Sequence, residues 1–465
     1  MNLASVVRQH AHDLGEKIAI RYRDETITYS ELWEAIERIA SWLYAKDVRK
    51  GDRVALSMAE HPDHLVAHYA VARLGAVILP MDHRWTDSEK QATAEAFAAA
   101  IVVTDDDGLS EESRVDLPGI DETDSDLLIS LSSGTTGRPT GAIVTHHNLY
   151  ERFVSQWHAI GYGQDDCFAV LTPFYFGAGR SFGMSLLAAG GSVLIAPPPM
   201  KPPEIIETLQ QDVVTATFLP PTLMRRLFEF HGDRDPPLFP NLRYLISSGE
   251  PLFADEAQQV IRKLTPNLYS YYASSEGGGI SVLRAEDFAN YADTVGKPTY
   301  KTEVEIVDEN DSDVGIGVIG RLRYRGPGVA TRHLDADGIE SDAGVGGWFY
   351  PGDLAERLAS GHIALRGRDK EVIIRGGVNI YPAEIEATLL AHPDISEAAV
   401  VGVDDAERGQ MVTAFLVTTL DEEALDAYCR QSLAPYKVPQ AFNALPELPK
   451  RSSGKIDKKA LVSPG

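Results

Sequence analysis

The spacing of apolar residues predicts a hairpin followed by a helix near the start of the chain. In residues 18–22 and 27–29, apolar and polar positions alternate on either side of a turn at Asp24-Glu25, which is the period of a β-hairpin. From residue 32 to 43 the apolar side chains recur at helical spacing. Ser30 has a side chain suited to cap the N-terminus of this helix.

After Gly51, short apolar runs alternate with helical patterns. Alternation of this kind predicts a mostly parallel sheet with helices on its faces. The expected strands are 54–56, 77–79, 101–103, 127–129 and 142–145, and the expected helices are 64–74 and 88–100.

A second series of the same type begins after Asn148, so the sequence predicts two stacked α/β subdomains. Its expected strands are 168–171, 192–196, 215–219, 242–246 and 268–272, and its helices include 222–230 and 255–263.

From Val304 the pattern changes to a period of two, with many glycines between the apolar segments. The segments 304–307, 318–324 and 362–365 predict an antiparallel sheet or small barrel. A compact module follows, with helices at 382–391 and 422–433 and strands at 398–403 and 412–418.

The predicted fold is therefore α/β with two domains. Residues 1–368 form a large N-terminal domain of two stacked α/β subdomains plus a small β-barrel-like subdomain. Residues 369–465 form a small α+β C-terminal domain, of a size at which domains fold on their own.

Composition excludes several classes of function. The chain has 465 residues and a formal charge of −25, so it lacks the basic footprint that nucleic acid and anionic membrane surfaces require. Cys167 and Cys429 have no metal-ligand spacing and make no disulfide framework, which fits a reducing compartment. We find no signal peptide and no run as long as a membrane span, so we expect a cytoplasmic protein.

A loop rich in glycine and hydroxyl residues follows the expected strand 127–129. It reads Ser132-Ser133-Gly134-Thr135-Thr136-Gly137. Glycine allows successive amide groups to face inward as a concave anion site, and the hydroxyls add donors. It is not a Walker loop, because no Gly-Lys-Ser/Thr closes it and a strand follows it. The loop predicts a site for nucleotide phosphates, with a plain surface turn as the alternative.

Four further motifs follow this loop in the chain. They are Tyr272-Ala273-Ser274-Ser275-Glu276, Trp348-Phe349-Tyr350-Pro351-Gly352-Asp353, Gly367-Arg368-Asp369-Lys370-Glu371 and Ser453-Gly454-Lys455-Ile456-Asp457. In this order and at these spacings, the five motifs resemble the adenylate-forming superfamily of acyl-CoA synthetases, peptide-synthetase adenylation domains and firefly luciferase. They are most similar to the acyl- and aryl-CoA ligases. The resemblance extends from Tyr29 to Lys455.

The resemblance implies an enzyme that uses ATP and Mg²⁺ to convert a carboxylic acid to an acyl-adenylate, with release of pyrophosphate. Thioester formation with CoA then follows. The loop would hold the β- and γ-phosphates, and Glu276 would be the carboxylate ligand of Mg²⁺. Lys455 would bridge the acid and the α-phosphate in the transition state. The catalytic residues implied are Lys455, Glu276 and Arg368.

The resemblance also implies the nucleotide contacts. Tyr272 would stack on adenine, Asp353 would accept both ribose hydroxyls, and Arg368 would bind the ribose or the α-phosphate. The full set implied for ATP is Ser132, Ser133, Gly134, Thr135, Thr136, Gly137, Gly249, Glu250, Tyr272, Ser274, Ser275, Asp353, Arg368 and Lys455. Thr140 stands where most members have a lysine, so we expect weaker ATP affinity rather than loss of activity, and Arg138 would compensate.

The acid pocket departs more from the family pattern. Phe176 stands where many acyl- and aryl-CoA ligases have a histidine. Aromatic walls over glycine floors favour a flat or bulky apolar acid, although plain core packing also explains the aromatics. Arg180 lies nearby, where it would meet a second polar group of the substrate, and no aspartate marks an amino-acid substrate. The pocket residues implied are Phe176, Gly177, Phe218, Gly249, Gly277 and Gly278.

The C-terminal domain would be mobile, because in this family it rotates about a hinge between the two half-reactions. Lys370 stands at the hinge, and Gly376 and Gly377 at the pantetheine tunnel, which favours CoA as the acceptor. A separate carrier protein, or an amine or other small nucleophile, is the alternative acceptor. A catalytically silent nucleotide-binding homologue and a homodimeric assembly also stay open.

Overall fold

The structure is a computed structural model of the chain. It describes residues 1–109, 115–133, 139–196, 200–232, 236–250, 252–335, 337–375, 378–405, 409–450 and 456–462. The chain forms two compact units. The first combines Met1–Val304 with Tyr324–Phe349, and the second combines Glu305–Arg323 with Tyr350–Gly465.

A seven-stranded sheet in the first unit carries the predicted phosphate loop. Its order is β18-β17-β7-β6-β4-β3-β5, with β5, β3, β4 and β6 parallel and the other three added in antiparallel pairing. The strands are β3 (Arg53–Leu56), β4 (Val77–Pro80), β5 (Ala99–Val103), β6 (Asp126–Ser133), β7 (Pro139–Thr145), β17 (Arg332–Asp335) and β18 (Glu340–Asp342).

A nine-stranded sheet is the second layer of this unit. Its order is β14-β13-β12-β11-β10-β8-β9-β1-β2, parallel from β12 to β1 and antiparallel at both edges. The strands are β1 (Ile18–Tyr22), β2 (Glu25–Thr28), β8 (Cys167–Val170), β9 (Ser192–Ile195), β10 (Ala216–Phe218), β11 (Tyr244–Ser247), β12 (Leu268–Ser274), β13 (Gly278–Leu283) and β14 (Lys297–Pro298).

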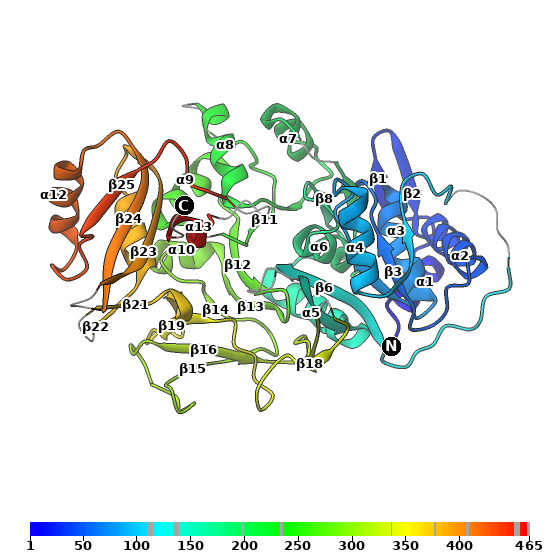
Figure 1. The fold of residues 1–465 in the computed structure, drawn as a ribbon. Coiled ribbons are helices and arrows are strands. Elements are labelled where there is room, and N and C mark those ends of the chain that lie inside the picture. Colours follow the sequence, from blue (N-terminus) through cyan, green and yellow to red (C-terminus); the bar gives the residue numbers. More distant parts are fainter. Residues whose placement is uncertain are drawn as a thin grey trace. The chain divides into compact units, whose positions relative to one another are not determined.

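Helices cover both sheets of the first unit (Figure 1). The largest apolar cluster contains residues of both sheets together with residues of α2, α3, α5 and α6, so these helices pack between the two layers. A smaller cluster packs α4 on the other face of the seven-stranded sheet. The helices are α1 (Leu3–Asp13), α2 (Tyr29–Ala45), α3 (Pro62–Arg73), α4 (Asp87–Ala96), α5 (His146–Ile160), α6 (Gly177–Ala188), α7 (Pro202–Leu209), α8 (Pro221–His231), α9 (Ala254–Lys263), the short 3-10 helix η1 (Ala285–Asp287) and α10 (Phe288–Tyr291).

The second unit has two smaller sheets. A four-stranded sheet has the order β15-β16-β19-β20, in which β19 pairs antiparallel with both β16 and β20. A five-stranded sheet has the order β22-β21-β24-β23 with β25 beside β24. Its elements are β15 (Glu303–Val307), β16 (Gly320–Arg325), β19 (Asp353–Arg357), β20 (Ile363–Arg368), η2 (Asp369–Glu371), β21 (Ile373–Arg375), β22 (Val378–Ile380), α11 (Pro382–Leu390), β23 (Ile395–Asp405), β24 (Gly409–Thr418), α12 (Glu422–Ser432), β25 (Ala441–Ala444) and α13 (Lys458–Val462).

Capping residues set the ends of several helices. Thr28 begins α2 with a capping box to Glu31, so the prediction that Ser30 is the N-cap was wrong. Thr145 caps α5 in the same way, and Gly161 ends that helix in the left-handed region. The expected helix 88–100 ends at Ala96, and Ala99 starts β5 instead. The predicted α/β fold class is confirmed, whereas the domain boundary after residue 368 stays a prediction.

Candidate active site

The predicted phosphate loop connects two paired strands. Strands β6 and β7 form an antiparallel hairpin in which Ser132 pairs with Thr140 and Ser133 pairs with Pro139. Gly141 is required beside the loop, because a Cβ there would lie 2.3 Å from Cγ2 of Ile129. The predicted phosphate-loop residues Gly134, Thr135, Thr136 and Gly137, with Arg138, lie outside the described residues, as do the side chains of Ser132 and Ser133.

The second motif forms the tight turn between β12 and β13. Ser274 pairs with Gly278 across this turn, which leaves Ser275, Glu276 and Gly277 at its tip. The Ser274 hydroxyl accepts a bond from the Gly277 amide at 3.0 Å and lies 2.5 Å from the Tyr324 hydroxyl. The Ala330 amide donates to the Glu276 carbonyl at 2.7 Å. The turn is therefore held by backbone groups and by the Ser274 hydroxyl, and the Glu276 carboxylate takes no part in these bonds.

Arg152 of α5 also holds this turn in place, although it lies in none of the five sequence motifs. Its guanidinium donates to the carbonyl of Gly328 at 2.7 Å, to that of Ser275 at 3.3 Å, and to that of Glu276. Burial lowers the pKa of Arg152 to about 10, against the opposing effect of Tyr324 and Glu276. Nothing in the sequence marked this residue, because its contacts join positions more than a hundred residues apart.

The Glu276 side chain is largely buried and faces a histidine. One carboxylate oxygen lies 3.7 Å from Nε2 of His333, and 16% of the Glu276 side chain is exposed. His333 packs edge-on against Phe349, with ring centroids 6.2 Å apart. Carboxylate oxygens of this kind are hard ligands, the type that Mg²⁺ prefers. In the described part of the chain, no cluster of three or more His, Cys, Asp or Glu forms a full protein cage for a metal.

Gly277→Ala tests the packing of this turn. A Cβ at residue 277 would lie 2.3 Å from Cε2 of Tyr324 and 2.4 Å from its hydroxyl oxygen. Because Tyr324 is fully buried, overpacking should cost about 1–3 kcal/mol of unfolding free energy and displace the Ser274–Tyr324 contact. Urea unfolding measures this loss. Gly163→Ala, with nothing within 4 Å of its Cβ, is the control, and equal losses in both variants would contradict the packing argument.

In the second unit, the two residues implied for ribose binding are neighbours. Asp353 at the start of β19 pairs in register with Arg368 at the end of β20. Nη1 of Arg368 lies 2.9 Å from the Asp353 carboxylate and 2.6 Å from the Pro351 carbonyl. Lys370 lies in η2 and is exposed. Gly376, Gly377 and Lys455 lie outside the described residues.

The residues implied for the acid pocket differ in burial. Phe176 is the N-cap of α6 and is 47% exposed, whereas Phe218 at the end of β10 is 6% exposed. The Phe218 ring stacks on Phe182 at 6.1 Å, and Phe182 packs edge-on against Tyr271 at 5.6 Å. Phe218 is thus part of an aromatic core cluster, while Phe176 is available to a ligand. Gly177 begins α6, Gly249 follows β11 with φ of 92°, and Glu250 lies 4.0 Å from Arg225.

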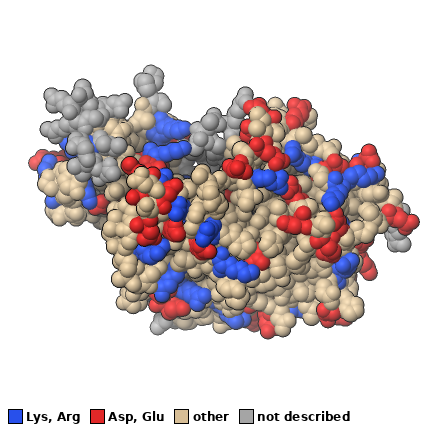
Figure 2. Space-filling model, turned by 90° about the horizontal axis from the view of Figure 1, so that it is seen from below, with Lys and Arg blue, Asp and Glu red and all other residues tan. Residues whose placement is uncertain are grey.

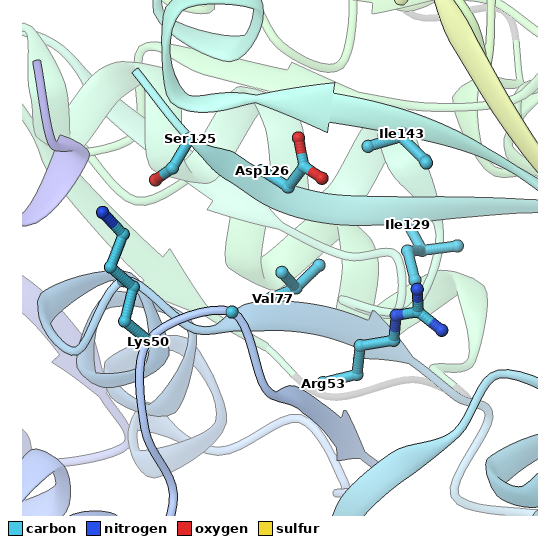
Figure 3. A pocket seen from close by; sticks show the side chains of 9 residues that line it. Lys50, Arg53, Val77, Ser125, Asp126, Ile129 and Ile143 are labelled. Carbon is cyan, nitrogen blue, oxygen red and sulfur yellow. The ribbon is translucent and has the colours of Figure 1, made fainter. Parts of the chain in front are cut away.

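A separate cavity of about 310 Å³ lies at the other end of the hairpin. Figure 3 shows Lys50 and Arg53 on either side of Val77, with Ser125 and Asp126 above. Asp126 begins β6, whereas the phosphate loop follows the end of that strand. This cavity is therefore not the predicted nucleotide site.

Two buried histidines of α3 should make the free energy of unfolding depend on pH. His64 and His68 are fully buried, and their Nδ1–H groups donate to the carbonyls of Ala59 and His64. Burial lowers the pKa of His64 to about 3 and that of His68 well below its usual value. Below about pH 6.5 the unfolded chain binds protons that the folded chain does not, so stability should fall by about 1.4 kcal/mol per histidine per pH unit.

Urea unfolding between pH 7.5 and 5 measures this dependence. His68→Leu should remove its share of the slope, because leucine cannot take up a proton in the unfolded chain. An unchanged slope in His68→Leu would show that this histidine does not stay neutral in the folded protein.

Acidic and basic side chains are intermingled on the face drawn in Figure 2. In the part of the chain that the structure describes, no helix is long and apolar enough to cross a membrane.

The fold and these motifs define a family. The sequence model of the AMP-binding enzyme family matches residues 7–130 and 116–334, and that of the AMP-binding enzyme C-terminal domain matches residues 384–455. The chain belongs to the AMP-binding enzyme family, and its resemblance to adenylate-forming CoA ligases is confirmed.

Individual relatives match over nearly the whole chain. A feruloyl-CoA synthase from an Amycolatopsis species is 30% identical over 95% of this chain and 94% of its own. A 2-succinylbenzoate–CoA ligase from Bacillus licheniformis is 28% identical over 97% of both chains.

Two solved structures also match nearly the whole chain. The o-succinylbenzoate CoA synthetase of Bacillus subtilis, in complex with its acyl-adenylate intermediate, has a TM-score of 0.90 at 25% identity and covers 99% of this chain and 98% of its own. ATP-bound MatB from Rhodopseudomonas palustris has a TM-score of 0.86 at 25% identity, with the same coverage. The Bacillus subtilis synthetase has also been solved with ATP and a magnesium ion.

Proposed function

We propose that this protein is an AMP-forming acid:CoA ligase. It converts a carboxylic acid and ATP to an acyl-adenylate and pyrophosphate, and then transfers the acyl group to the thiol of CoA. This proposal rests on the fact that known relatives match nearly the whole length of the chain. The family models match both the part with the phosphate loop and the C-terminal part, and the relatives that match nearly the whole chain are named as a CoA synthase and a CoA ligase.

Glu276 is the residue that would hold Mg²⁺. Bound Mg²⁺ neutralises the phosphate oxygens and so favours departure of pyrophosphate. The chain's own contribution is to place one carboxylate at the tip of a turn fixed by Arg152 and the Ala330 amide. Such fixed placement costs no rearrangement during the reaction.

Asp353 and Arg368 form the proposed ribose site. Arg368 holds one Asp353 oxygen at 2.9 Å, which orients the carboxylate to accept hydroxyl groups. Tyr272, Ser274, Ser275, Gly249 and Glu250 are the proposed neighbours of the nucleotide in the first unit. Lys455 is the proposed bridge between the acid and the α-phosphate, and its charge would offset the negative charge that builds up there.

We also propose the layout implied by the family. The division falls after residue 368, Lys370 is the hinge, and Gly376 and Gly377 line the path of the CoA arm. The acid is aromatic or otherwise bulky and apolar, bound against Phe176, Gly177, Phe218, Gly249, Gly277 and Gly278. Transfer to a separate carrier protein or to an amine is the second candidate for the last step.

A cytoplasmic location is part of the proposal. Cys167 and Cys429 are both unpaired and buried, which suits a reducing compartment. CoA is the acceptor expected there, and a homodimer is the assembly that we propose.

The acceptor is tested by incubating the protein with ATP, Mg²⁺ and a panel of carboxylic acids, with and without CoA. Products are identified by mass spectrometry. An acyl-CoA mass with one acid is the expected result. Acid-dependent pyrophosphate release without any CoA adduct would contradict the ligase proposal and favour a carrier protein or an amine.

A further inference from the structure

His333 is a partly exposed histidine that none of the five sequence motifs contains. It is the second residue of β17, and 29% of its side chain is exposed. Among the described residues, neither of its ring nitrogens makes a hydrogen bond, and the Glu276 carboxylate, 3.7 Å from Nε2, is too far away for one. A bound ligand can therefore reach a polar ring that no described protein group uses.

The register of β17 shows which face of the seven-stranded sheet carries His333. Leu334, the next residue, is fully buried in the apolar cluster that contains α4. Because successive side chains of a strand point to opposite faces, His333 lies on the face away from α4. Its partner across the strands is Ala142 of β7, which belongs to the apolar cluster between the two sheets. His333 therefore lies on the side where the Glu276 turn of the other sheet meets this one.

The same register brings His333 close to the phosphate loop. Thr140 is the second residue of β7, the strand that leaves the loop, and it pairs with Asp335. His333 and Thr140 thus take diagonal positions on one face, which lie roughly 7–8 Å apart. The Asp335 carboxylate accepts bonds from two amides in the turn between β17 and β18, both at 2.9 Å. His333 is therefore a neighbour of both the phosphate-loop strand and Glu276.

The ring of His333 is supported by groups that also support the Glu276 turn. It packs edge-on against Phe349, which is 8% exposed, with ring centroids 6.2 Å apart. Phe349 in turn packs against Tyr324 at 5.6 Å, and the two residues exchange backbone hydrogen bonds of 2.9 Å. The Tyr324 hydroxyl contacts Ser274 of the turn. A donor held in this way needs no rearrangement when its ligand binds.

We infer that His333 is a phosphate-binding residue, whose Nε2–H donates a hydrogen bond to an oxygen of the β- or γ-phosphate of ATP. This inference rests on the proposed function and adds a residue to the same site. A neutral imidazole has one N–H donor, and its bond to an ionised phosphate is stronger than a bond between neutral groups. The chain has a formal charge of −25, so bound phosphates depend on local donors of this kind.

The affinity of the protein for ATP relative to AMP tests this role, because AMP lacks the β- and γ-phosphates. Calorimetric titration gives both affinities. His333→Phe keeps a ring against Phe349 but removes both ring nitrogens. Its affinity for ATP should fall by roughly tenfold to a hundredfold, as expected for the loss of a hydrogen bond to a charged group, while its affinity for AMP stays unchanged. The ratio is measured within each variant, so a general loss of folded protein does not change it.

Two further variants and a metal titration sharpen the test. His333→Gln keeps an N–H donor, so its ratio should lie between those of the wild type and His333→Phe. His392→Phe is the matched control, since His392 also packs edge-on against an aromatic ring, Tyr428 at 4.8 Å, but lies in the second unit. Its ratio should equal that of the wild type. The loss in His333→Phe should persist at saturating Mg²⁺, because the inferred bond does not pass through the metal.

Three results would overturn the inference. They are an unchanged ratio in His333→Phe, a ratio in His333→Gln as low as in His333→Phe, and recovery of the wild-type ratio at saturating Mg²⁺. The last result would show that His333 acts only through Glu276. In all three cases the wild type still binds ATP, so the proposed function stands. A wild-type protein that binds neither nucleotide would instead contradict the proposed function, and this inference with it.

Discussion

Lys455→Ala is expected to slow acyl-adenylate formation by roughly a hundredfold to a thousandfold, as removal of one preorganised donor to a developing charge does in other active sites. ATP should still bind, because the phosphate loop, Asp353 and Arg368 are unchanged. The match to the model of the C-terminal domain ends on Lys455. Lys450 and Ile456, which lie on either side of it in the sequence, form an isolated antiparallel β-bridge. Single-turnover assays of adenylate, together with nucleotide binding, separate the two effects.

Lys459→Ala is the control for that variant, since Lys459 lies four residues away and is exposed on α13. Its rate of adenylate formation should equal that of the wild type. A normal rate in Lys455→Ala would show that this lysine does not have the role assigned to it.

Glu276→Gln is expected to weaken the apparent affinity for Mg²⁺ by roughly tenfold to a hundredfold and to lower the rate at limiting Mg²⁺. Glutamine keeps the size of the side chain but removes the charge that a hard cation prefers. The fold of the turn should survive, because its bonds to Arg152 and Ala330 use the backbone carbonyl of residue 276. A titration of activity against Mg²⁺, with thermal unfolding measured in parallel, checks both statements.

Glu286→Gln replaces an exposed carboxylate in η1 and should leave the Mg²⁺ titration unchanged. If Glu276→Gln gave the wild-type titration, the metal would be held by other groups.

Much of the fold could be predicted because strands and helices alternate with clear periods. Strands such as β8 and β9 are short apolar runs between helical patterns, and the structure places them as neighbours in one parallel sheet. The bounds of helix α6 could not be predicted, because Gly177, Gly179 and Gly183 interrupt its apolar pattern. Gly179 has no space for a Cβ, which would lie 2.5 Å from the Thr172 carbonyl, so packing rather than helix propensity explains that glycine.

Pairings between distant segments could not be predicted. Strand β17 joins the phosphate-loop hairpin by pairing with β7, and β1 joins the second sheet by pairing with β9. A period of two shows which residues share a face of a strand but not which other strand it meets.

The same limit applies to the site. Glu276, Asp353 and Arg368 could be named as candidates because each lies in a short contiguous motif. Arg152 and Tyr324 hold the Glu276 turn, and His333 faces its carboxylate, yet none of them belongs to a motif. Their roles depend on packing across long sequence separations. Arg180 was noticed from its position near Phe176, and the structure shows that it is buried and donates to the carbonyls of Phe174 and Tyr175.

The proposed function requires that the protein makes an acyl-adenylate before any acceptor takes part. This is measured by the exchange of labelled pyrophosphate into ATP in the absence of CoA, with a panel of carboxylic acids. We expect exchange that requires both an acid and Mg²⁺, and that is nearly abolished in Lys455→Ala. Exchange that occurs without any acid, or only after CoA is added, would contradict it.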